Sequence, residues 1–524
     1  MKKDRKLFAI FVLVFLNISR LFYAAILAGL LFTPVFGNEH CGTTRFIEKL
    51  KNPVKKFSAA STGCVPKNYY GKVDTAITEN FIIFYTKERP DIYAHAIKTT
   101  EYIDSLKSYL EQAYELYRDS LGLDTIFGTN RTYHYQENVP FKPKSGKRYY
   151  PVEVIDIGLM RNYEGEDYDV LGMVFSPYTS RPKETQIAIE NDFLYGADCS
   201  GKLSEKRIIS RQNVDYSIEW RIALKTIAFH ELYHSFQFAI YDMINNPDSF
   251  WYEAAASGVE EIGVPEFDNY INHLYKAFQN PGQSMINGTG YEHATLYLFL
   301  FSELGSKFDS YILDYFSKYP KENFAYQLAM LANNLGIDSE DLFHRYAQKV
   351  FFSGSRAAWV PQDSLLWPQD QYSWPLWRIS VDRVTSPRIL PSIAIDFVRT
   401  SSSNVPPNVD SVARKSFLED SNSYIWVLSR LLEAEFIPPE PPEPPKPSGI
   451  HWNLLKPDVK LTFGILPENS KGMEIRSANG TLIKKIEGSP GEEIIWPFEN
   501  PPKSGIYFYR ILPNGKARKL IVTS

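Results

Sequence analysis

The sequence predicts an α+β fold in which a sheet-bearing lobe precedes a mainly helical lobe and small all-β regions follow. Three observations predict it: short β-branched runs precede residue 192, helical periodicity dominates residues 291–352, and strand-like runs return after residue 354. Strands grouped before helices, without regular alternation, are typical of α+β proteins. With 524 residues, 44% of them hydrophobic, the chain is long enough for two or three domains.

The first lobe is predicted to contain several strands and one long helix. The run ENFIIFYT (79–86) alternates and is β-branched, and residues 91–122 then place apolar side chains at spacings of three and four. Gly122 is expected to end that helix. Further strands are expected at YYPVEVIDIG, GMVFSPY and TQIAIEND, residues 149–158, 172–178 and 185–192.

A second helix is expected from about Ser217 to Tyr241 and a third from near Phe250. Residues 291–352 are mostly helical in pattern, in the runs YEHATLYLFLFSELG, FDSYILDYFSKY, NFAYQLAMLANNLG and DSEDLFHRYAQKVF. We place one domain over residues 38–353.

The N-terminus indicates export. The run MKKDRKLFAIFVLVF is a basic stretch followed by an apolar one, the pattern of a Sec signal peptide. Residues 1–37 are therefore predicted to be a signal peptide or an uncleaved N-terminal anchor, and the pattern leaves both open. No later run approaches the ~18 to 20 apolar residues of a membrane helix. The protein is expected to be secreted or held at the cell surface, with any membrane contact through this segment.

The region after residue 354 is predicted to hold two small β regions joined by a linker. Strand-like runs and clustered tryptophans indicate a β-rich domain over residues 354–436, where the tryptophans suit a core better than a carbohydrate platform. The run IPPEPPEPPKPSG makes residues 437–449 a polyproline-type spacer, because proline cannot extend a sheet or a helix. Turn signals at regular intervals predict a β-sandwich over residues 450–524. The clustered tryptophans are Trp359, Trp367, Trp374 and Trp377.

Composition excludes two classes of protein. The net charge of −4 offers no basic excess to neutralise phosphates, so nucleic acid is not an expected partner. Three cysteines are too few for a disulfide framework. In an exported protein Cys41 could pair with Cys64 and leave Cys199 free, but the sequence does not decide this pairing.

The stretch TIAFHELYHSFQFAIYD, Thr226 to Asp242, carries the pattern H-E-x-x-H. His230 and His234 are four residues apart, so on a helix they point the same way and can ligate one Zn²⁺. Glu231 lies where it can reach a water beside the metal rather than the metal itself. The alternative is a histidine pair on a partly buried helix.

Glu253 is the candidate for the third protein ligand that a catalytic zinc needs. It follows His234 with eighteen residues between, in the run FWYEAAASGVEE, whose alanines would let its helix approach the first closely. The alternative for a glutamate in a first helical turn is interaction with the helix dipole. The sequence leaves calcium binding open.

The spacing of His230, Glu231, His234 and Glu253 resembles the HExxH-x18-E pattern of gluzincin zinc metallopeptidases. The sequence around these residues is similar to that of secreted bacterial members. The resemblance covers roughly residues 75–350 and implies a thermolysin-like, zincin-like catalytic domain. It implies three zinc ligands, with Glu231 as general base, and a protein or peptide substrate pairing along the 185–192 strand. Motifs of aminopeptidase specificity are missing, so an endopeptidase is expected.

Residues around the ligands have less specific patterns. Ser257 and Glu260 share the helix face of Glu253, and either could accept a proton from a ligating histidine. Tyr291 and His293 follow a glycine-rich turn. Similar gluzincins use a tyrosine or histidine to hold the developing oxyanion, so both are candidate catalytic residues. The other histidines, including His273, are expected to be structural or exposed.

The last sixty residues resemble the C-terminal sorting domains of the type IX (Por) secretion system. The matching features are the strand into Asn479-Gly480, IIWPFEN around Trp496, SGIYFYRI and Lys519 in a final apolar strand. The resemblance implies secretion machinery as a partner. Three functions stay open: a secreted zinc endopeptidase, a surface binding or adhesion protein that has lost activity, and a zinc hydrolase of a non-peptide bond.

Overall fold

The chain forms two compact units, residues 1–437 and 438–524, which are described separately. The predicted N-terminal segment 1–37 and linker 437–449 lie outside the described residues. The computed structural model describes Cys41, Thr43 and residues 72–88, 95–124, 126–129, 148–157, 170–176, 181–194, 214–240, 249–381, 388–401, 409–410, 413–420, 423–433, 461–467, 470–477, 481–496, 505–513 and 518–522.

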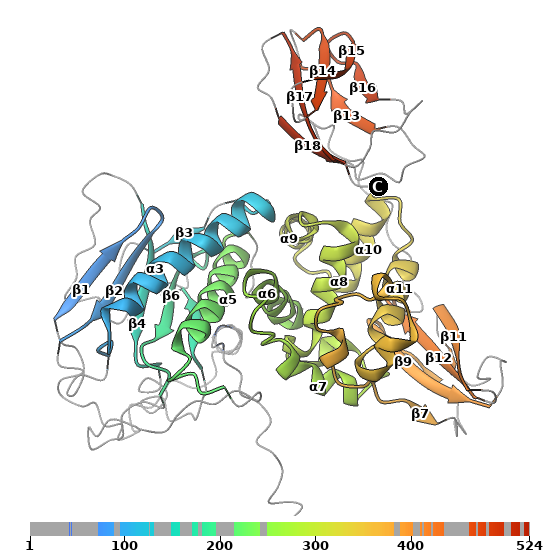
Figure 1. Ribbon diagram of the computed structural model, residues 1–524, viewed down its shortest axis with the longest axis horizontal. Helices are drawn as coiled ribbons and strands as arrows, with labels where there is room; N and C mark the ends of the chain where they lie inside the picture. Colours follow the sequence, from blue (N-terminus) through green and yellow to red (C-terminus); the bar gives the residue numbers. More distant parts are fainter. Residues whose placement is uncertain are drawn as a thin grey trace, which may run out of the picture. The chain divides into compact units, whose positions relative to one another are not determined.

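A six-stranded mixed sheet opens the first unit (Figure 1). Strands β2, β4 and β6 run parallel, β1 pairs with β2 antiparallel, and β5 pairs with β6 antiparallel. Every side chain of β4 is buried, as expected of a strand covered on both faces. The strands are β1 (Val73–Ile77), β2 (Phe81–Thr86), β3 (Phe127–Gly128), β4 (Tyr150–Ile155), β5 (Gly172–Phe175) and β6 (Glu184–Glu190).

The long helix predicted over residues 91–122 is present but begins later. Helix α3 (Thr100–Glu115) continues as a π-helical turn, Leu116–Ser120, and the chain leaves it near Gly122, which has a φ of 74°. Thr99 caps the start by accepting a hydrogen bond from the Glu101 N–H. Before the helix, Ala96 forms a parallel β-bridge with Thr86 and the Ile97 N–H donates to the Thr86 carbonyl, so these residues belong to the sheet edge rather than to the helix.

Helix α5 (Trp220–Ile240) lies between the sheet, α3 and α6 (Ser249–Gly263) (Figure 1). It matches the second predicted helix. Nearly all its side chains from Ala223 to Ala239 are buried, which is expected of a helix that is hydrophobic all round. The Tyr117 hydroxyl donates to the Phe229 carbonyl at 2.6 Å, so α5 is also fixed by side-chain hydrogen bonds.

The second lobe is helical, as predicted, although one short helix was not expected. That helix, α7 (Ile271–Gln279), buries Leu274 and Phe278, and the partly buried Ile271 and Ala277 pack on the same core, so its apolar pattern is helical but only nine residues long. The remaining helices of this lobe are α8 (Ala294–Leu304), α9 (Phe308–Lys318), α10 (Phe324–Asn334) and α11 (Ser339–Phe351).

The β region after residue 380 packs on the helices. Phe351 of α11 contacts Phe397 and Phe417, with ring centroids 5.4 and 5.5 Å apart. Trp377 stacks on Phe278 of α7 at 3.9 Å, so this tryptophan belongs to a core shared with the helical lobe. The four-stranded sheet has the order β11 (Ala413–Asp420), β12 (Ser423–Arg430), β9 (Ala394–Thr400) and β7 (Ser380–Val381), and β8 (Arg388–Ile389) pairs with β10 (Val409–Asp410).

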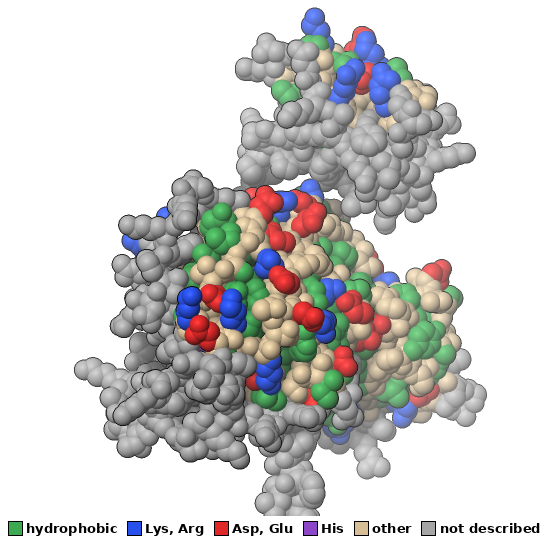
Figure 2. Space-filling view, turned by 60° about the vertical axis from the view of Figure 1, so that its left-hand side comes forward, with side chains coloured by type: hydrophobic (Ala, Val, Ile, Leu, Met, Phe, Trp, Pro, Cys, Tyr) green, Lys and Arg blue, Asp and Glu red, His purple; other side chains and the backbone are tan. Residues whose placement is uncertain are grey.

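The second unit consists of small antiparallel sheets, as the sequence predicts. One sheet has the order β15 (Leu482–Glu487), β14 (Gly472–Ser477), β17 (Gly505–Leu512) and β18 (Arg518–Val522), and β13 (Leu461–Ile465) pairs with β16 (Glu493–Trp496). Figure 2 shows basic and acidic side chains intermixed on the visible face of the described chain. Within the described ranges, no helix is both long and apolar enough to cross a membrane.

Asp309 gives a pH-dependence that can be tested. Its buried carboxylate in α9 accepts hydrogen bonds from the Tyr233 and Tyr297 hydroxyls. Burial raises the pKa of Asp309 from 3.8 to about 7, against the two hydrogen bonds, which lower it. The folded protein therefore binds a proton that the unfolded chain has released, so the free energy of unfolding falls as pH rises between those values. Across this pH range the free energy of unfolding falls by on the order of 4 kcal/mol.

We expect Asp309→Asn to flatten urea-denaturation stability between pH 4 and 8, because the amide does not titrate. Asp341→Asn, on the exposed face of α11, is the matched control and should retain the wild-type slope. An unchanged slope in Asp309→Asn would contradict the assignment.

Candidate metal centre

Helix α5 brings His230 and His234 onto one face, as the H-E-x-x-H spacing predicts. Their Nε2 atoms lie 3.1 Å apart, and both side chains are buried. Two imidazole nitrogens can approach this closely only if one carries a hydrogen or both face a shared cation. The pair therefore forms half of a converging donor set.

Glu253 of α6 completes a triangle of donors. Its Oε2 lies 3.1 Å from His230 Nε2 and 3.5 Å from His234 Nε2. Ligands of a tetrahedral zinc at ~2.0–2.1 Å are about 3.3 Å from one another. The three separations therefore fit one zinc-sized ion, as the sequence predicts for these three residues.

Small residues let Glu253 reach the histidines. Ala254, Ala255 and Ala256 are fully buried in α6, which packs directly on α5. Gly290 also permits a close approach, since its φ is 105° and an added Cβ would lie 2.7 Å from the Glu253 Cβ. Only glycine suits that position.

Each histidine is oriented through its other nitrogen. Glu260 accepts a hydrogen bond from His230 Nδ1, and the Gln237 Oε1 lies 2.7 Å from His234 Nδ1. These contacts direct both Nε2 atoms at the shared position. Of the two predicted partners it is Glu260 that makes the contact, while the Ser257 hydroxyl has no hydrogen-bond partner among the described residues.

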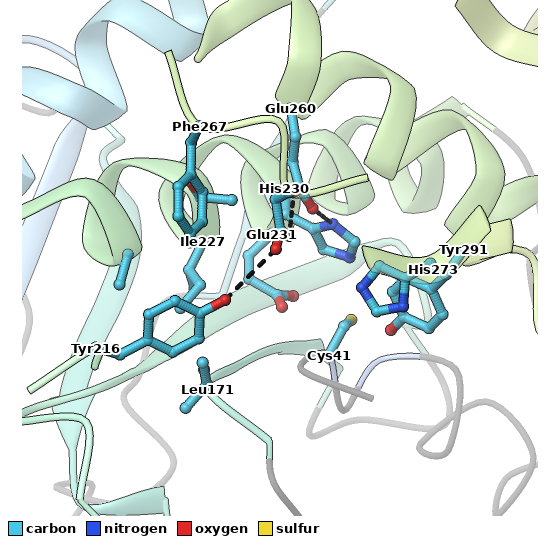
Figure 3. A pocket seen from close by; sticks show the side chains of 13 residues that line it. Cys41, Leu171, Tyr216, Ile227, His230, Glu231, Glu260, Phe267, His273 and Tyr291 are labelled. Carbon is cyan, nitrogen blue, oxygen red and sulfur yellow. Dashed lines mark hydrogen bonds and ion pairs between the residues drawn. The ribbon is translucent and has the colours of Figure 1, made fainter. Parts of the chain in front are cut away.

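Gln237 was missed by sequence reasoning, although it lies three residues after His234 on the same helix. Asn269 was missed too, and its amide donates to Glu260 Oε2 at 2.8 Å. The Tyr216 hydroxyl donates in turn to Asn269 Oδ1 at 3.4 Å (Figure 3). This chain of hydrogen bonds leads from His230 across the pocket.

Glu231 points into the pocket beside the donor set and is not one of the three converging groups (Figure 3). Burial raises its pKa, opposed by the nearby His230 and His234. Strand β5 crosses directly above it: a Cβ on Gly172 would lie 2.7 Å from the Glu231 Cγ. A side chain at Gly172 would displace the glutamate.

Tyr291 lines the same pocket, whereas His293 is not among its lining residues. The Tyr291 ring is nearly parallel to His230, at 6.0 Å and 12°, and also stacks on His273 at 5.0 Å (Figure 3). His293 contacts the edge of Phe250, and burial lowers its pKa. His273, expected to be structural or exposed, is a pocket residue that no local motif signals.

The charges of the centre favour a cation. Burial lowers the pKa of His234, but Cys41 and Glu253 outweigh it and raise that pKa to about 10. Burial likewise opposes ionisation of Glu253, yet His234 and His230 lower its pKa to about 2. The pKa of His230 is also raised, against burial, by Cys41 and Glu260. The anionic surroundings therefore demand either protonated histidines or a metal ion.

Cys41 joins the donor set from far away in the sequence. Its Sγ and the donor atoms of His230, His234 and Glu253 all lie within 4.8 Å of one another, and all four residues are buried. Cys41 is a free thiol, so the pairing with Cys64 that the sequence left open is not formed. Its spacing from the other donors gives no motif, which explains why the sequence did not show it.

The strand at the edge of the site is β5, not β6. Strand β6 pairs with β4 on one side and β5 on the other, so the prediction that residues 185–192 form the cleft edge is wrong. Gly172 of β5 instead forms an isolated parallel bridge with Cys41. No protein-family model, curated protein or solved structure matches this chain.

Zinc binding should release protons, because the histidines hold them when no metal competes. We expect one zinc per chain with submicromolar affinity and release of at least one proton at pH 7. Isothermal titration calorimetry in buffers of different ionisation enthalpy measures both quantities. His234→Ala should lower the affinity at least 100-fold, whereas His273→Ala, in the same pocket, should retain it. Equal zinc affinity in both variants would refute the ligand assignment.

Proposed function

We propose that this chain is an exported zinc-dependent metallopeptidase that cleaves internal peptide bonds. The convergence of two histidine nitrogens and one Glu253 oxygen, at separations that suit zinc, carries the proposal. The HExxH-x18-E pattern supports it, because Glu231 is the residue that gluzincin-like enzymes use as a base.

His230, His234 and Glu253 would hold the ion through Nε2, Nε2 and Oε2. A zinc ion there supplies Lewis-acid polarisation of a carbonyl and lowers the pKa of water. Glu260 and Gln237 keep the imidazoles in the tautomer that presents a lone pair at Nε2. The surrounding apolar core excludes bulk water, which strengthens these electrostatic interactions.

Glu231 is the proposed general base. Its carboxylate lies beside the donor set in a buried pocket, where its raised pKa suits it to take a proton from water and deliver it to the leaving amine. The contact of Gly172 with its side chain limits where the carboxylate can move. Glu231 is thus positioned for both proton transfers.

Tyr291 is the proposed oxyanion donor. Its stacking on His230 and His273 fixes the ring at the rim of the donor set. A hydroxyl there would stabilise negative charge that develops on a carbonyl oxygen. We expect Tyr291→Phe to lower kcat by about 10- to 100-fold with little change in KM, measured by steady-state hydrolysis of a peptide. His293→Ala is the matched control. A larger loss of kcat in His293→Ala than in Tyr291→Phe would assign the oxyanion role to His293 instead.

An extended peptide is the substrate class that the edge strand suits. The outer backbone groups of β5 face the pocket, and main-chain pairing at such an edge recognises peptides without a fixed sequence. An ester or sugar substrate has no use for that pairing. A zinc hydrolase of a non-peptide bond remains an alternative, as does an inactive surface binding protein, and the retention of Glu231 beside an intact donor set argues against the latter.

We also propose that the protein is exported. The basic and apolar N-terminus supports passage through Sec, and the antiparallel second unit carries the strands that resemble type IX sorting domains. We propose that residues 450–524 bind the secretion machinery and that the catalytic unit acts outside the cell.

Glu231→Gln tests the peptidase proposal. We expect the variant to bind one zinc per chain and to lose hydrolysis of a fluorescent casein by at least 10²- to 10⁴-fold, because glutamine cannot accept the proton. Glu266→Gln, an exposed glutamate, is the matched control. Activity that is measurable in the wild type and equal in Glu231→Gln would refute the assigned base.

A further inference from the structure

Two residues from the N-terminal part of the chain, Cys41 and Thr43, lie at the metal centre. We propose that Cys41 is a fourth protein ligand and that Cys41 and Thr43 together keep the centre latent until they are displaced. This inference rests on the proposed function, because it concerns regulation of the same site.

The number of protein ligands is the first argument that Cys41 closes the site. Catalytic zinc sites have three protein ligands and an open position, whereas four protein ligands make a closed site. The Cys41 sulfur lies within 4.8 Å of the three other donor atoms, and only 2% of the residue is exposed. Thiolate is a strong zinc ligand, so Cys41 would close the position that water needs.

Thr43 blocks the base. Its hydroxyl donates to Glu231 Oε2 at 3.0 Å and accepts a hydrogen bond from the Val174 N–H at 2.8 Å. The hydroxyl therefore occupies the place from which water would give its proton to Glu231. Cys41 and Thr43 thus block the metal and the base at the same time.

The edge strand is occupied as well. Cys41 bridges Gly172, and Thr43 binds the next outward-facing amide, that of Val174. Alternate residues of a strand direct their backbone groups to the same side, so both contacts fall on the edge away from β6. An incoming peptide that pairs along this edge would have to displace Cys41 and Thr43.

Release is a ligand exchange without electron transfer. The Cys41 sulfur would leave as a thiolate and take up one proton from the buffered solution, and a water molecule would take its place. Thr43 moves with it, which frees Glu231 and the β5 edge together. Any event that withdraws this segment, including cleavage after it, would activate the enzyme.

Cobalt(II) in place of zinc tests the ligand in the full-length chain. Wild type and the matched thiol control Cys64→Ala should show thiolate-to-cobalt charge-transfer absorption at one cobalt per chain, and Cys41→Ala should lack it while retaining the metal. Acetohydroxamate, a small metal chelator, should bind cobalt-loaded Cys41→Ala at least 10-fold more tightly than wild type. Absence of the absorption band in metal-loaded wild type, or equal acetohydroxamate affinity, would overturn the proposal.

A second measurement does not depend on the folding of Cys41→Ala. An organomercurial added to cobalt-loaded wild type should remove the charge-transfer band and admit acetohydroxamate, and Thr43→Val should bind acetohydroxamate more tightly than wild type. A band that persists after Cys41 is shown by mass spectrometry to be mercurated would overturn the assignment.

Casein hydrolysis separates the two proposals. We expect activity to rise at least 10-fold in Cys41→Ala and to vanish in Cys41→Ala/Glu231→Gln. Tighter acetohydroxamate binding without hydrolysis would support closure by Cys41 and refute the peptidase. Hydrolysis that is equal in wild type and Cys41→Ala would support the peptidase and refute latency.

Discussion

The burial of charge along α5 is the constraint on which the rest of the first unit depends. A helix enclosed by a sheet on one side and helices on the other has to place two imidazoles and one carboxylate where water cannot solvate them, and α6 adds the buried carboxylate of Glu253. Such charges persist only when they are paired, hydrogen-bonded or bound to a metal. The hydrogen bonds of Glu260 and Gln237, the small residues of α6 and the glycine at Gly290 all serve that requirement.

The features predicted correctly are those that depend on a pattern within a short stretch of sequence. The helix with His230 and His234, the following helix with Glu253, the α+β class and the antiparallel C-terminal sheets are all present. Each depends on periodicity or spacing within a short stretch, where side-chain direction follows from backbone geometry. The early start predicted for α3 was wrong because the apolar periodicity extends into residues 95–99, where pairing with Thr86 and the Thr99 cap decide the backbone.

Contacts between distant segments could not be predicted. Cys41, Leu171 and His273 line one pocket although no motif links them, and their proximity depends on how strands and helices pack. The choice of β5 rather than β6 as the edge likewise depends on strand order, which alternation alone does not give. Trp374 and Trp377 join the helical core for the same reason: their shared neighbour Phe278 comes from an earlier helix.

The division of the ligands between α5 and α6 has a mechanical consequence. An ion held by His230, His234 and Glu253 ties two neighbouring helices together and closes the chain segment that joins them, as a covalent cross-link would. Its binding energy would then also be folding energy for the centre of the molecule. The ion would therefore serve the architecture as well as the chemistry, and the chain without it would have a looser core that proteases cleave more readily.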